Sequence, residues 1–183
     1  RSDANNWAVY HQKSNASPEE YALYLDGTSA ATDDSGLAND TAPTSSVFSL
    51  TDGNYGNQSS FNYIGYFFSE VQGYSKFGSY EGTNNANGAF VYTGFSPAFV
   101  LVKSIDSTDH WRMMDNKRGV SNPPLYPHLT NVDPGGNYTF DFLANGFKWR
   151  NTDGDANAAQ TYIYMAFAHA PFVNSEGVPA NAR

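Results

Sequence analysis

Cysteine is absent from this chain of 183 residues, which excludes a disulfide framework and a metal site built from thiolates. Long apolar runs are absent as well, so no membrane-spanning helix of about twenty apolar residues is expected. Charged residues make up 15% of the chain, below the roughly one quarter that is usual in soluble domains. Because 18 Asp and Glu outnumber 10 Lys and Arg, the net charge is -8, which argues against a nucleic-acid partner.

Residues that carry out chemistry are also sparse. The four histidines, His11, His110, His128 and His169, do not show the spacing of a metal site. Glycoside hydrolysis needs two carboxylates beside the sugar, and only Glu70 lies on a predicted core strand. The sequence has neither a Gly-x-Ser-x-Gly elbow nor a glycine-rich phosphate loop before a helix. We therefore expect no enzyme activity, no catalytic residues and no cofactor, with one candidate calcium loop as the exception.

Aromatic residues and turn formers are abundant instead. Aromatic residues account for 16% of the chain, and there are 16 glycines. No window has a convincing helical period, and short apolar runs end at Gly, Asn, Pro or Ser. This pattern predicts an all-β fold, an antiparallel β-sandwich of the jelly-roll or lectin-like kind. The clearest hairpin signal is Asn145-Gly146. Strands are expected near residues 7–12, 21–26, 47–50, 63–71, 74–80, 89–93, 99–104, 111–115, 138–143, 147–150 and 162–168.

A tryptophan-led pattern occurs twice and predicts a duplicated, pseudo-symmetric unit. Trp7 and Tyr63 in the first copy correspond to Trp111 and Tyr162 in the second, and we expect all four to be buried structural anchors. Residues 62–71 and 161–170 are apolar nearly throughout, so both are expected to form central strands that are buried on two faces. The predicted organisation is one sandwich over residues 1–172, with repeat units of about 1–81 and 89–172, and an arm or linker over 173–183.

One acidic segment is a candidate calcium loop. Asp153, Asp155 and Asn157 place oxygen ligands at alternate positions, as the start of such a loop does. An EF-hand needs a glutamate at its twelfth position, and that position here is Tyr164, inside a predicted strand. A plain acidic turn is the alternative interpretation.

One predicted strand is a candidate glycan-binding face. Tyr74, Lys76 and Tyr80 alternate along it, and exposed aromatic faces can stack on the apolar face of a sugar. The alternative is a half-buried strand of the sandwich, which shows the same alternation.

Several phrases of the sequence resemble those of a known family. They span residues 71–80, 90–103, 111–118, 143–147 and 162–172. The family is an uncharacterised domain found at the ends of tail-fibre and other virion structural proteins of phages, many of them marine or freshwater. The resemblance implies a β-sandwich and a location that is extracellular or on the virion surface, and it brings no catalytic residues. In that family a strand of the form Gly-Phe-x-Pro-x-x-Val commonly precedes the first Trp segment, but here such a strand precedes only Trp111.

These observations lead to two functional hypotheses. The first is a structural subunit of an extracellular or virion fibre, either a phage tail fibre or a helical filament, which forms a homo-oligomer through an open sheet edge before Trp7. The donated segment is expected to contain Asn6, or Val173, Val178 and Pro179 in the tail. The alternative is a module of a phage tail fibre that recognises a cell-surface glycan.

Overall fold

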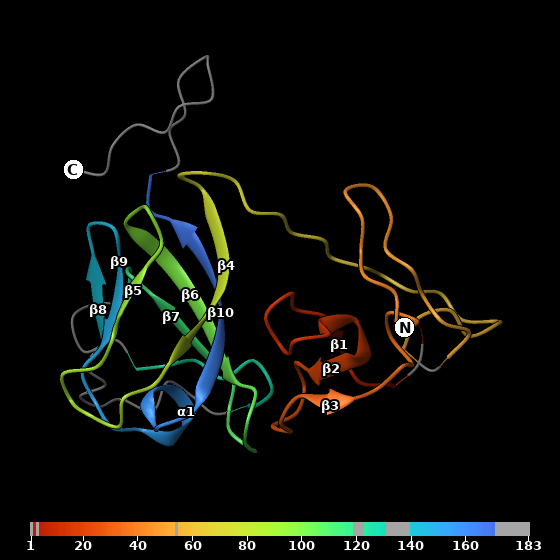
Figure 1. Cartoon of the computed structure of the whole chain (residues 1–183), viewed down its shortest axis with the longest axis horizontal. Helices are drawn as coiled ribbons and strands as arrows, with labels where there is room; N and C mark the ends of the chain where they lie inside the picture. The colour runs from red at the N-terminus through yellow and green to blue at the C-terminus, as the bar shows by residue number, and fades with distance from the viewer. Residues whose placement is uncertain (1, 3, 54, 119–122, 131–139, 171–183) are drawn as a thin grey trace, which may run out of the picture.

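The computed structural model describes residues 2, 4–53, 55–118, 123–130 and 140–170, and almost every regular element in them is a β-strand (Figure 1). A four-stranded central sheet and a three-stranded outer sheet pack as a sandwich, and a small third sheet lies on the other side of the central sheet. All the strand pairs are antiparallel. The predicted all-β antiparallel sandwich is therefore confirmed.

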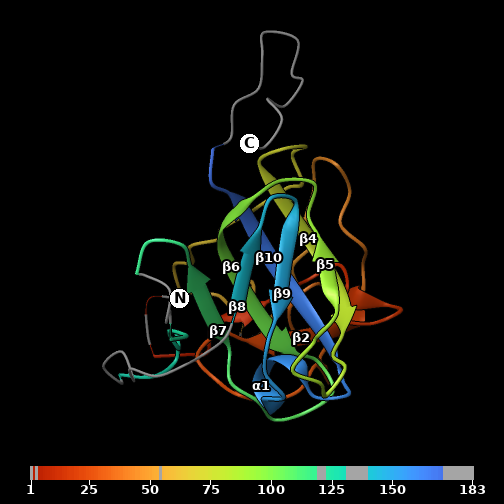
Figure 2. The same ribbon diagram turned by 90° about the vertical axis from the view of Figure 1, so that its left-hand side faces the viewer.

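The three sheets have the following order. The central sheet contains β4 (Ser75–Glu81), β10 (Thr161–Ala168), β6 (Pro97–Ser104) and β7 (Arg112–Asp115). The outer sheet contains β5 (Phe90–Tyr92), β9 (Gly146–Trp149) and β8 (Phe140–Leu143), and Figure 2 shows it in front of the central sheet. The N-terminal sheet contains β1 (Ala8–Val9), β2 (Tyr21–Tyr24) and β3 (Thr32–Asp33). Short helical turns lie at η1 (Pro18–Glu20) and α1 (Gly154–Asn157).

Strand β10 is buried on both faces, as its apolar sequence predicts. It pairs with β4 on one side and with β6 on the other. Its Tyr162 and Tyr164 belong to the core shared with the outer sheet, where they meet Tyr80 and Phe147. Ile163 points to the opposite face and belongs to a second cluster with residues of the N-terminal sheet. Side chains of successive residues alternate between faces in a strand, so one strand supplies both cores.

The predicted hairpin at Asn145-Gly146 is present, with a different role for the glycine. The turn between β8 and β9 consists of Ala144 and Asn145, and Gly146 is the first residue of β9. A Cβ atom at Gly146 would lie 2.1 Å from the carbonyl oxygen of Val91 on β5. Glycine is needed here because the neighbouring strand approaches closely.

Residues 62–71 contradict the prediction of a second central strand. They form no strand, and their large apolar side chains other than Tyr63 are exposed. An apolar composition does not by itself make a segment central in a sheet. Strand β10 is central because β4 and β6 flank it, whereas no described strand flanks residues 62–70. Residues 47–50 also form no strand, and β3 was not predicted.

The four proposed anchors are not equivalent, and the structure does not show the predicted pseudo-symmetry. Trp111 and Tyr162 are buried, with Trp111 only 3% exposed. In contrast, Trp7 is 53% exposed and Tyr63 is half-buried, so the expectation that both are buried anchors is wrong. The difference follows from their neighbours, because Trp111 lies between the central and N-terminal sheets whereas Trp7 lies at the surface.

Two further expectations concern the termini and the membrane. Asn6 is exposed just before β1. Val173, Val178 and Pro179 lie outside the described residues. In the described part of the chain, no helix has the length and apolar character needed to cross a membrane.

Candidate functional site

An extended apolar stretch, which we call the 61–71 segment, is the main exposed feature. It runs from the N-terminal unit, which is the N-terminal sheet together with its loops, to the start of β4 (Figure 1). Its end is fixed by a bridge between Val71 and Ser75, and near its start the Asn62 amide donates to the Ser2 hydroxyl at 3.2 Å. Between these points, the backbone groups of residues 63–68 have no hydrogen-bond partner in the described part of the chain.

Aromatic contacts hold the segment loosely against the protein. Trp7 stacks on Tyr66 with ring centroids 6.4 Å apart, and Phe48 meets the edge of Phe67 at 5.8 Å. These contacts leave the rings in water. Five of its large apolar side chains have exposed fractions between 44% and 74%: Ile64, Tyr66, Phe67, Phe68 and Val71.

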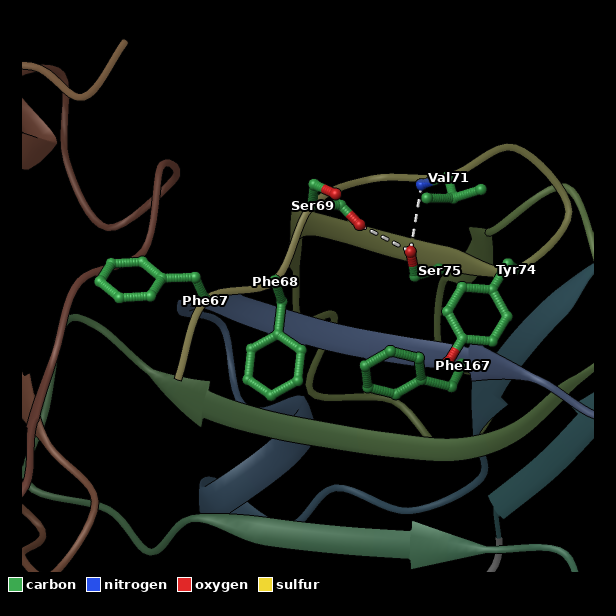
Figure 3. Close-up of a pocket in the computed structure, with 7 residues that line it drawn as sticks. All are labelled: Phe67, Phe68, Ser69, Val71, Tyr74, Ser75 and Phe167. Atoms are coloured by element: carbon green, nitrogen blue, oxygen red, sulfur yellow. Dashed lines mark hydrogen bonds between the residues drawn. The ribbon is translucent and has the colours of Figure 1, made fainter. Parts of the chain in front are cut away.

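A shallow pocket lies where the 61–71 segment meets the central sheet (Figure 3). Its volume is about 400 Å³, and it is lined by Phe67, Phe68, Ser69, Val71, Tyr74, Ser75 and Phe167. The Ser75 hydroxyl donates to the Ser69 carbonyl at 2.7 Å and accepts from the Val71 amide at 3.1 Å. Because this hydroxyl is already engaged, the pocket offers mainly aromatic walls, which suit an apolar side chain.

The three residues of the predicted glycan face do not lie together. Tyr74 is exposed and lines the pocket, and Lys76 forms an ion pair with Glu70 at 3.0 Å. Tyr80 is buried, stacks on Tyr162, and donates from its hydroxyl to the Ala156 carbonyl at 2.7 Å. Burial raises the pKa of Tyr80 well above its usual value. The prediction of Tyr80 as a glycan ligand is wrong, because its position on β4 points into the core.

The three residues of the candidate calcium loop have other partners. Asp153 and Asp155 each bind the Arg112 guanidinium, with nitrogen–oxygen distances of 2.8 Å. Asp153 also caps α1 by accepting from the Asp155 amide. The Asn157 side chain bonds the backbones of Thr83 and Asn85, at 3.0 and 2.8 Å. The oxygens are arranged around a guanidinium, which fits the acidic turn better than the calcium loop.

The rest of the described structure offers no alternative metal site. Among the described residues, no group of three or more His, Cys, Asp and Glu is placed to hold a metal ion. His110 and His128 do stack, with Nδ1 and Nε2 2.7 Å apart, but these two nitrogens face each other.

Sequence reasoning missed a buried polar cluster beside α1. The Lys103 side chain is fully buried and donates to the carbonyl oxygens of Ser104 and Ser107 at 2.7 and 3.2 Å. Burial lowers the pKa of Lys103 to about 8, although Asp109 and Asp155 oppose the shift. The sequence did not predict this burial. Lys103 lies near the end of an apolar strand, where a lysine commonly reaches the surface. Its contacts are structural, since they are made to backbone carbonyls.

His11 provides a pH-dependent contact between the N-terminal unit and the central sheet. Its Nε2 contacts the Tyr164 carbonyl at 3.2 Å, and its Nδ1 accepts from the Lys13 amide at 3.1 Å. This pattern requires the neutral ring with its proton on Nε2. Burial is the largest cause that lowers the pKa of His11 to about 4.

Lowering the pH should therefore destabilise the protein. The unfolded chain takes up the His11 proton near pH 6.5 and the folded protein only near pH 4, so stability is lost as the pH falls between these values. We expect a loss on the order of 2 kcal/mol, measured by urea unfolding at pH 7 and pH 4.5. In His11→Gln, which keeps a donor but cannot titrate, the pH dependence in this range should shrink. An unchanged pH dependence in that variant would contradict this role for His11.

Comparison with known proteins gives one result. A family model described as a domain of unknown function, DUF7483, matches residues 1–171. No curated protein and no solved structure matches the chain.

Proposed function

The chain belongs to the DUF7483 family, and we propose that it is a structural subunit, without enzyme activity, that associates with further copies into an extracellular or virion fibre. The observation that carries the proposal is the exposure of the 61–71 segment, in which five large apolar side chains within eight residues are exposed. Contiguous exposed apolar surface marks an interaction site on a soluble protein. The extracellular or virion setting comes from the sequence resemblance and stays a prediction.

Burial of this surface would provide a driving force for association. Burial of one large apolar side chain contributes about 1.5–3 kcal/mol, and five such side chains are already exposed for between 44% and 74% of their area. Several kcal/mol are therefore available before the costs of association are subtracted. A monomer in water would gain nothing from this arrangement, whereas an assembled subunit would bury it.

The backbone of the segment supports the same proposal. The unpaired N–H and C=O groups of residues 63–68 in the described structure are able to form a ladder with another strand. Strand addition obtains its affinity from such main-chain bonds and its specificity from alternate side chains. The 61–71 segment has both features.

The test compares the oligomeric state of matched variants by sedimentation velocity. In the triple variant Ile64→Ser, Tyr66→Ser, Phe67→Ser we expect assembly to be lost and the free energy of unfolding to change by less than about 1 kcal/mol, because the three side chains are exposed. Val47→Ser with Leu129→Ser is the control, since it removes exposed apolar side chains outside the segment. Assembly of the triple variant at wild-type concentrations would overturn the role of the segment.

Glycan recognition is the second candidate, and the pocket beside Tyr74 is the observation that favours it. Tyr74 and Phe167 present aromatic rings there, 5.7 Å apart. Sugar binding also requires hydrogen-bonding groups directed at hydroxyls, and Ser75 is engaged internally. Binding on a glycan array that Tyr74→Ala abolishes would establish this function, and an array without signal would remove it.

A further inference from the structure

The edges of the sandwich differ in how they are protected from other strands. Its edge strands are β4 and β7 in the central sheet and β5 and β8 in the outer sheet. Charged residues occur on the first two and on β8: Lys76 and Glu81, Arg112 and Asp115, and Asp141. Strand β5 has none, and residues 82–102 as a whole contain no Asp, Glu, Lys or Arg. Because charges on an edge discourage strand pairing, β5 is the unprotected edge.

Local contacts also cover parts of two of the other edges. On β4, the Phe77 amide donates to the Glu70 carboxylate at 3.0 Å, and its carbonyl accepts from Gln12 at 3.4 Å. On β7, Met113 and Leu125 exchange two backbone hydrogen bonds, at 2.8 and 2.9 Å.

The backbone of β5 faces outward at Phe90 and Tyr92. Val91 pairs with Phe147 of β9, and the Thr93 amide donates to the Asn145 carbonyl at 3.0 Å. Because hydrogen-bonding direction alternates along an antiparallel strand, the groups of Phe90 and Tyr92 turn away from β9. No partner for them occurs in the described part of the chain.

The side chains of this edge are apolar as well. Phe90 is 46% exposed and Tyr92 63% exposed, and their rings lie 6.5 Å apart. An edge with unpaired backbone groups and exposed aromatic side chains is a template for an incoming strand.

We propose that the 61–71 segment of a second copy adds as a strand to the free edge of β5. This inference rests on the proposed function and identifies the acceptor surface. The two surfaces have the same chemistry over residues 61–69, which lack charged residues and are rich in aromatic ones. The one charged residue of the segment, Glu70, forms an ion pair with Lys76. Once the segment is extended beside β5, alternate aromatic side chains align with Phe90 and Tyr92, as in cross-strand pairs.

The positions of the two surfaces set the type of assembly. Strand β5 lies on one face of the central sheet, and the 61–71 segment lies toward the N-terminal unit on the other (Figure 1). The segment of one copy therefore meets β5 of the next in a head-to-tail contact. Repetition of such a contact gives an open filament when the rotation does not close a ring.

A complementation experiment tests this contact. The donor-blocked variant is Ile64→Ser, Tyr66→Ser, Phe67→Ser, which keeps β5 intact. The acceptor-blocked variant is Tyr92→Pro, which removes one outward N–H and one aromatic ring from an edge strand, where proline is tolerated. Phe90→Lys is the second acceptor-blocked variant, which introduces a charge and keeps the backbone donor. Circular dichroism confirms that each variant is folded.

Each blocked variant alone should stay monomeric, with the concentration needed for assembly raised by more than about tenfold. A 1:1 mixture of a donor-blocked and an acceptor-blocked variant should form dimers and nothing longer, because each supplies the surface that the other lacks. Normal filaments from both acceptor-blocked variants would overturn the role of β5 and leave the proposed function intact. A mixture that stays monomeric would overturn the pairing, and a wild-type chain that never assembles would overturn the proposed function itself.

Discussion

Replacement of Trp111 by alanine should lower the free energy of unfolding by about 3–5 kcal/mol, as large-to-small changes in a core do. Trp111 is 3% exposed and packs with Leu23 and Ile163 between the N-terminal unit and the central sheet. Its indole nitrogen donates to the Tyr24 carbonyl at 2.8 Å. The substitution removes the packing and leaves that carbonyl without its partner, so the expected effect is among the largest in the chain.

Trp7→Ala is the matched control for this prediction. Trp7 is 53% exposed and its ring stacks on that of Tyr66, so we expect a loss below about 1 kcal/mol. Urea unfolding of the two variants under the same conditions measures the difference. Equal large losses would mean that Trp7 is buried in solution, as the duplicated pattern predicted.

Loss of the Arg112 guanidinium should have an effect of similar size. Arg112→Met is expected to cost about 3–5 kcal/mol, because it leaves two carboxylates of a mostly buried ion-pair group without their cation. The Arg112 side chain is 3% exposed, and its guanidinium contacts both Asp153 and Asp155 at 2.8 Å. The measurement is again urea unfolding at pH 7.

Arg118→Met is the control, because it removes the same positive charge from a more exposed ion pair. Arg118 forms an ion pair with Asp115 in which both side chains are about a quarter exposed, so its removal should cost less than about 1 kcal/mol. The triple variant Arg112→Met, Asp153→Asn, Asp155→Asn should recover part of the stability, because no buried charge is then left unpaired. Similar losses for Arg112→Met and Arg118→Met would contradict the central role of the buried group.

Sequence patterns identified most of the sandwich but not the fate of one apolar segment. Residues 62–71 and β10 have similar composition, and both fit a buried strand. Only β10 has strands on both sides, and its partners β4 and β6 are far from it in the chain. The apolar composition of a segment shows that it is suited to burial. Whether it is buried depends on neighbouring strands, which its own sequence does not identify.

The candidate sites show the same limit. Alternation correctly placed Tyr80 on a strand but could not decide which face of β4 is covered, and that face packs on Phe147 of the outer sheet. The acidic residues Asp153 and Asp155 were recognised as a cluster, but their cation, Arg112, comes from a distant strand. Side-chain chemistry can be read locally, whereas the partner that decides its role is supplied by the fold.

Negative-stain electron microscopy of the purified chain tests most directly the claim that it is a building block. We expect unbranched filaments longer than a few subunits from the wild-type chain, and none from the variant Ile64→Ser, Tyr66→Ser, Phe67→Ser. Dispersed monomers or small closed rings from the wild-type chain would contradict the account.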